Sequence, residues 1–149
     1  MKSNIRKLPE IIGFISGVIF GNLYVYIVGC LAAIAVPRQF FLWFGRHYVA
    51  ALSVDELFTV AIPLFLISAV WTTSTVFIFR AHYRRIAMWC LCGYSLTWVI
   101  VMLAYESPIF NIAVYTQQPW IILTMIAAPC GIVASGYFLS KLSHYRWST

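Results

Sequence analysis

Charge is what this sequence has least of. Only 9% of its 149 residues are Asp, Glu, Lys or Arg, while 62% are hydrophobic; an ordinary soluble domain carries roughly 25% charged residues. The mean hydropathy is +0.87. A soluble fold of this length has too much surface for its volume to hide so many apolar side chains. The composition therefore excludes a soluble domain and predicts an integral membrane protein.

Catalytic and metal-binding motifs are also missing. The sequence contains no HExxH, CxxC, GxSxG or Walker-type pattern. Its three histidines lie at or beyond the ends of the apolar runs, which excludes paired haem ligands between helices. Cys90 and Cys92 lie about 200° apart around a helix, so they cannot share one metal ion there. We therefore expect no enzymatic activity, no cofactor and no metal.

Four apolar runs are long enough to cross about 30 Å of hydrocarbon as helices. They cover about residues 11–36, 54–79, 86–104 and 119–140. Lipid offers no partner to free backbone groups, so each run is expected to be helical. The sequence thus predicts an all-α integral membrane protein, with four transmembrane helices in an antiparallel bundle that forms a single transmembrane domain over residues 1–149.

The N-terminal segment has a second interpretation. Basic residues, an apolar run and the pair Ala33 and Ala35 around Ile34 resemble a secretory signal with its cleavage site. The apolar run exceeds the roughly 7 to 15 residues of a signal's hydrophobic region. We therefore interpret it as the first transmembrane helix.

Basic residues are unevenly distributed between the connections. Eight of the ten Lys and Arg residues lie before the first run, between the second and third, or after the fourth; only Arg38 and Arg46 lie in the other connections. By the positive-inside rule this predicts a multi-pass inner-membrane protein with both termini in the cytoplasm. Topology thus accounts for the net charge of +6, and no nucleic-acid partner is expected.

The first outer connection is amphipathic rather than polar. As a helix, residues 38–52 place aromatic side chains on one face, which predicts a short helix lying in the membrane interface, where an outside partner could also dock. We expect the following aromatic residues at the two interfaces: Phe40, Phe41, Trp43, Phe44, Trp89 and Trp120. After this segment, Ser53 and Glu56 have the spacing of a capping box, which predicts that the second helix begins there.

Small residues recur at helical spacing in the first and fourth runs. The first run has Gly13, Gly17 and Gly21, with Asn22 beside the third, and the fourth has Ala127, Gly131 and Ser135. Such stripes permit close approach of helix backbones in lipid. Either the first run packs on the fourth within one chain, or its stripe is exposed and drives self-association or binding to another membrane protein.

These observations favour a non-catalytic protein that acts by helix packing with a membrane partner or with itself, in contact with the lipid bilayer. An accessory subunit of a membrane complex fits, and so does an immunity or exclusion protein against an incoming toxin or conjugation machine. The alternative is an oligomeric channel or transporter whose pore is lined by uncharged polar residues such as Asn22 and Thr72–Thr75. All four acidic residues are expected at span ends, which argues against that alternative because transport pathways are marked by intramembrane charge.

Overall fold

The computed structural model describes residues 2–34, 42–43, 47–79, 82–104 and 118–146; for residues 2–6, 79, 102 and 142–146 it describes the backbone alone. Every regular element in these ranges is a helix. The elements are α1 (Lys2–Ala32), α3 (Tyr48–Glu56), η1 (Leu57–Ala61), α4 (Ile62–Phe79), α5 (Tyr83–Ala104) and α7 (Ile121–Arg146). The all-helical expectation is therefore confirmed for the described part of the chain.

Among the described residues, three stretches are long and apolar enough to cross a membrane: Lys7–Ala32, Tyr48–Ile78 and Ile121–Lys141. They contain most of the first, second and fourth runs picked out from the sequence. The remaining long helix, α5, has 22 residues and carries Arg84 and Arg85 in its first turn. The chain thus has the length and composition of a membrane protein.

The second span begins earlier than the sequence predicts. Elements α3, η1 and α4 follow one another without a break, so one helix runs from Tyr48 to Phe79. Residues 48–52 therefore extend the second span instead of forming a separate interfacial helix. The π-helical stretch η1 ends directly before the first residues of α4, where Pro63 lacks the N–H that would continue the regular ladder.

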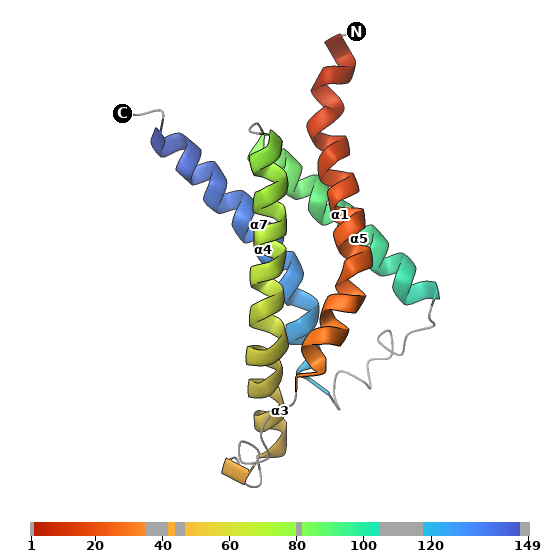
Figure 1. Ribbon diagram of the computed structural model, residues 1–149, viewed down its shortest axis with the longest axis vertical. Coiled ribbons are helices and arrows are strands. Elements are labelled where there is room, and N and C mark those ends of the chain that lie inside the picture. The colour runs from red at the N-terminus through yellow and green to blue at the C-terminus, as the bar shows by residue number, and fades with distance from the viewer. Residues whose placement is uncertain (1, 35–41, 44–46, 80–81, 105–117, 147–149) are drawn as a thin grey trace.

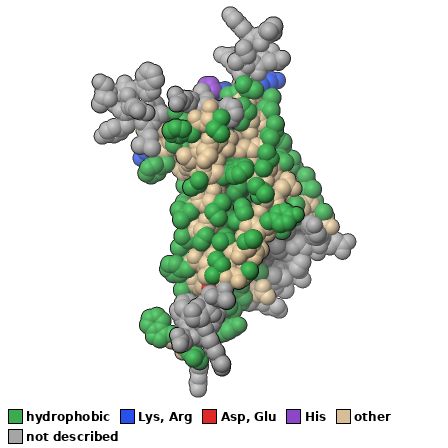
Figure 2. Space-filling view, in the orientation of Figure 1, with side chains coloured by type: hydrophobic (Ala, Val, Ile, Leu, Met, Phe, Trp, Pro, Cys, Tyr) green, Lys and Arg blue, Asp and Glu red, His purple; other side chains and the backbone are tan. Residues whose placement is uncertain are grey.

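The helices cross one another obliquely. In Figure 1, α1 and α4 follow the long axis, while α5 and α7 cross it at an angle, and the marked N and C ends both lie near the top. The closest partners are α1 with α5 and α4 with α7, and α5 also packs on α7. The face seen in Figure 2 is mostly apolar through its middle, with the visible Lys and Arg side chains near the upper end.

The core is shared by all four long helices. Phe20, Leu64, Cys90 and Ile132 are fully buried, and each comes from a different one of them. Lipid tails are as apolar as these side chains, so close packing rather than escape from water holds such a core together. The positions at which the backbones come close therefore decide how the helices associate.

Candidate functional site

The glycine stripe of α1 lies against α5. A Cβ atom at Gly13 would lie 2.5 Å from the carbonyl oxygen of Ile86, and one at Gly21 would lie 2.8 Å from Cβ of Thr97. At Gly17 a Cβ would overlap the carbonyl group of Cys90. The stripe therefore packs within the chain, directly against α5.

The opposing helix contributes a glycine of its own. A Cβ at Gly93 in α5 would overlap the carbonyl of Phe14 and lie 3.0 Å from the backbone nitrogen of Val18. The two helices thus meet backbone to backbone from both sides. Gly93 was not singled out from the sequence, because it is the one glycine in its apolar run and forms no periodic stripe.

The glycine in the small-residue stripe of α7, Gly131, packs on α4. A Cβ at Gly131 would overlap the hydroxyl of Ser68 and the carbonyl of Phe65. Ala127 and Ser135 are buried, and the Ser135 hydroxyl donates a hydrogen bond to the Ile132 carbonyl at 2.9 Å. Neither arrangement expected from the sequence is found: the first and fourth runs do not pack glycine on glycine, because the glycines of α1 lie against α5 and Gly131 lies against α4, and the stripe of α1 is buried rather than exposed.

Polar side chains join the middle of α1 to the second half of α4. The hydroxyls of Ser16 and Thr75 share a hydrogen bond of 2.8 Å, and Nε1 of Trp71 donates to the Ser16 hydroxyl oxygen at 3.0 Å. Bonds of this kind in lipid contribute about 0.6 to 2 kcal/mol. The contact fixes the register of two helices whose sequences show no matching small-residue stripe.

The hydroxyl groups of residues 72–75 do not gather on one face. Thr72 is buried and donates to the Ser68 carbonyl, whereas Ser74 is exposed and donates to the Val70 carbonyl. Thr75 is within hydrogen-bonding distance of the Trp71 carbonyl at 3.0 Å. Within one chain, these hydroxyl groups therefore do not line a common surface.

A second set of polar side chains connects α1, α3 and α7 near the start of α7. The Thr124 hydroxyl donates to the carboxylate of Glu56, and the Tyr24 hydroxyl donates to the Thr124 backbone carbonyl at 3.4 Å. The Tyr94 ring packs edge-on against Tyr24, with centroids 5.6 Å apart. The Tyr94 hydroxyl and Oδ1 of Asp55 are buried without a hydrogen-bond partner among the described residues. We call Glu56, Tyr24, Tyr94 and Thr124 the acidic cluster.

The contacts of Ser53 and Glu56 contradict the capping box expected from the sequence. Ser53 does not cap a helix: it lies inside α3, and its hydroxyl donates to the Val49 carbonyl at 2.8 Å. Glu56 does not reach back to it but accepts a hydrogen bond from α7. Since the helix begins at Tyr48, Asp55 and Glu56 lie within the membrane-length stretch Tyr48–Ile78 and not at its start.

Asn22 faces away from the other helices. Its side chain is exposed, and its amide nitrogen donates to the Val18 carbonyl of its own helix at 2.9 Å. Gly29 lies seven residues further along the same face, and a Cβ atom there would have no neighbour within 4 Å. The outward face of α1, which we define by Ile15, Asn22 and Gly29, therefore combines an exposed amide with a glycine that has room for a neighbour.

The interfacial aromatic residues are only partly described. Trp43 is 87% exposed and Trp89 is 40% exposed, with the Trp89 ring edge-on to Phe14 at 6.4 Å. Trp120 is half-buried in the turn before α7. The remaining three, Phe40, Phe41 and Phe44, lie outside the described residues.

Groups that could hold a metal ion are not found in the described part of the chain, where no three His, Cys, Asp or Glu residues come together. Cys90 is buried, and Cys30, Cys92 and Cys130 are exposed; all four are free thiols. Comparison of the chain with family models, curated proteins and solved structures finds no match. The arrangement of helix faces is therefore the basis for any functional proposal.

Proposed function

We propose that this chain is a non-catalytic, multi-pass protein of the inner membrane that acts by packing the outward face of α1 against another membrane protein or a second copy of itself. It would have four transmembrane helices in an antiparallel bundle, with α5 as the third span and both termini in the cytoplasm. An accessory subunit and an immunity or exclusion protein are both consistent with this mode of action.

The observation that carries the proposal is the exposure of Asn22 midway along α1. In a span that faces lipid, the side-chain oxygen of this amide has no water to bind, and one donated bond goes to the same helix. Asparagine in such a position favours association with a helix that supplies a partner for the amide. Gly29 on the same face leaves room for that helix to approach.

The span count and orientation are supported by the distribution of charge. After Arg85, α5 has no charged residue as far as Ala104, which suits a helix in hydrocarbon. The marked chain ends, the end of α4 and the start of α5 lie towards the same end in Figure 1. The basic residues near them would lie on the cytoplasmic side by the positive-inside rule.

The proposal is tested by purification from native membranes after crosslinking. The wild-type chain should retain one membrane protein, or a second copy, in a defined ratio. Asn22→Leu should reduce this recovery about ten-fold while leaving the helical circular dichroism unchanged. Asn22→Gln, which keeps the amide, serves as the control and should retain most of the association. Equal recovery with the Asn22→Leu variant and the wild type would refute the role of this face.

A transporter remains the second candidate, because the acidic cluster lies within a membrane-length stretch. Ionisable side chains in such positions often mark a path for ions or protons. Proton or cation flux into liposomes that contain the purified chain would support this function, provided that Glu56→Gln abolishes the flux and Asn22→Leu does not. A complete lack of flux from correctly inserted protein would exclude it.

A further inference from the structure

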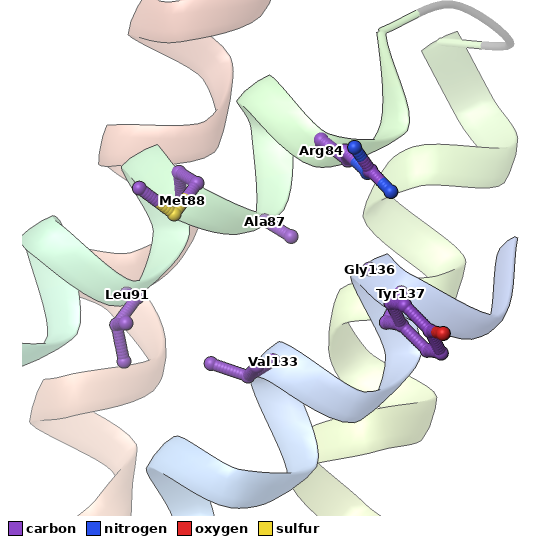
Figure 3. Close-up of a pocket in the computed structure, with 7 residues that line it drawn as sticks. All are labelled: Arg84, Ala87, Met88, Leu91, Val133, Gly136 and Tyr137. Atoms are coloured by element: carbon purple, nitrogen blue, oxygen red, sulfur yellow. The ribbon is translucent and has the colours of Figure 1, made fainter. Parts of the chain in front are cut away.

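A groove of about 190 Å³ lies between α5 and α7. Its lining residues are Arg84, Ala87, Met88, Leu91, Val133, Gly136 and Tyr137. Figure 3 shows the first four along α5 and the other three along α7, with Arg84 at the upper end of the groove. Apart from Arg84 and the Tyr137 hydroxyl, the lining side chains are apolar.

The two helices approach each other closely at two residues that line the groove, Ala87 and Gly136. At Gly136, a Cβ atom would lie 2.5 Å from Cβ of Ala87, so the backbones are close there. On the open side, Met88 and Val133 are exposed, with 63% and 52% of their surface accessible. The result is a slot that is closed at its base and open towards the membrane.

Positive charge gathers at one end of this slot. Arg84 is exposed and lines the groove, and Nζ of Lys141 lies 5.1 Å from the centre of the Tyr137 ring. Neither α5 nor α7 contains an acidic residue anywhere along its length. Glu10 belongs to α1 and is not among the lining residues of the groove. No ion pair is formed among the described residues that would neutralise Arg84.

We infer that the groove binds an anionic phospholipid, with an acyl chain lying between Met88 and Val133 and the phosphate held by Arg84 and Lys141. An apolar slot with cations at one end matches the two parts of such a molecule, and a basic pocket between membrane helices is a known arrangement for anionic headgroups. If the proposed orientation holds, the bound phospholipid belongs to the inner leaflet. The binding chemistry itself does not depend on the orientation.

The test is native mass spectrometry of the detergent-solubilised chain with added phosphatidylglycerol or phosphatidylcholine. We expect phosphatidylglycerol to bind more tightly, and Arg84→Gln and Lys141→Gln each to weaken it about five-fold, the effect of roughly one basic side chain near an anionic lipid. Arg85→Gln is the matched control, because Arg85 is exposed on the same turn of α5 but does not line the groove. It should change the affinity less than two-fold.

A second variant tests the acyl-chain part of the site. Val133→Phe narrows the groove and leaves both cations in place, so it should weaken phosphatidylglycerol binding as strongly as Arg84→Gln. Equal binding of the two lipids, or equal effects of Arg84→Gln and Arg85→Gln, would overturn the proposal. It would also be overturned if Val133→Phe had no effect, or if the Val133→Cys variant crosslinked quantitatively to a second copy through position 133. A wrong orientation would change none of these results in detergent.

Discussion

Glycine occurs on both faces of α1, but its surroundings on the two faces differ. On the inward face, Gly17 rests against the carbonyl group of Cys90, and no side chain fits between the helices. On the outward face, Gly29 has open space around it. Glycine on a membrane helix therefore does not by itself identify a contact. The neighbouring backbone decides whether a side chain can be tolerated.

Polar residues on α1 differ in the same way. Ser16 lies on the inward side, where its hydroxyl is bonded to Thr75 and Trp71 of α4. Asn22 lies on the outward side, where its amide nitrogen bonds to its own helix. A polar group paired across two helices stabilises the fold of one chain. An exposed polar group in lipid is instead free to stabilise contact with another chain.

The largest effect expected from this comparison is that of Gly17→Leu. A leucine side chain cannot occupy the position of the Cys90 carbonyl, so α1 and α5 must separate. We expect the free energy of unfolding to fall by about 3 kcal/mol or more, at the upper end of overpacking effects. Circular dichroism during titration with sodium dodecyl sulfate in mixed micelles would measure the change.

Gly29→Leu is the matched control, because it makes the same substitution in the same helix. With nothing within 4 Å of the added Cβ, it should not destabilise the chain, and it should stabilise it by up to about 1 kcal/mol because leucine is a better helix former than glycine. If both variants unfold at the same detergent concentration, the distinction between the two faces is wrong.

The sequence was sufficient to predict helices and close packing but not the partners in that packing. The spacing of Gly13, Gly17 and Gly21 indicates a face without side chains, whichever helix it meets. The partner helix contributes a single glycine, Gly93, beside Cys90 and Thr97, so it has no repeated glycine that would have indicated the contact. The more obvious small-residue run, which contains Gly131, packs against Ser68 and Phe65 of α4.

The start of the second span was mispredicted for a related reason. A capping box stabilises a helix that begins at its first residue, but the same spacing occurs by chance inside longer helices. Residues 48–52 have no Gly or Pro to end a helix, so the helix continues through Ser53. The hydrogen bond between Thr124 and Glu56 connects residues 68 positions apart, and no local pattern predicts such a contact.

A smaller effect is expected from the polar contact on the inward face. Trp71→Phe removes the indole N–H that donates to Ser16, and Ser16→Ala removes the acceptor hydroxyl. Each variant should cost about 1 kcal/mol of unfolding free energy, and the double variant should cost less than their sum by about 0.6 kcal/mol. The same detergent titration would measure all three. Strict additivity would mean that the two side chains do not interact across the helices.

The smallest effect should come from Ser53→Ala, which extends the comparison from α1 to the second span. At a true N-cap this substitution costs about 0.5 to 2 kcal/mol, because a backbone N–H loses its acceptor. Here the Ser53 hydroxyl donates to a carbonyl one turn earlier in an unbroken helix, and alanine is the better helix former. The free energy of unfolding should therefore change by less than about 0.5 kcal/mol. A loss above about 1 kcal/mol would place the start of the helix at Ser53 after all, and Asp55 and Glu56 would then return to the end of the span.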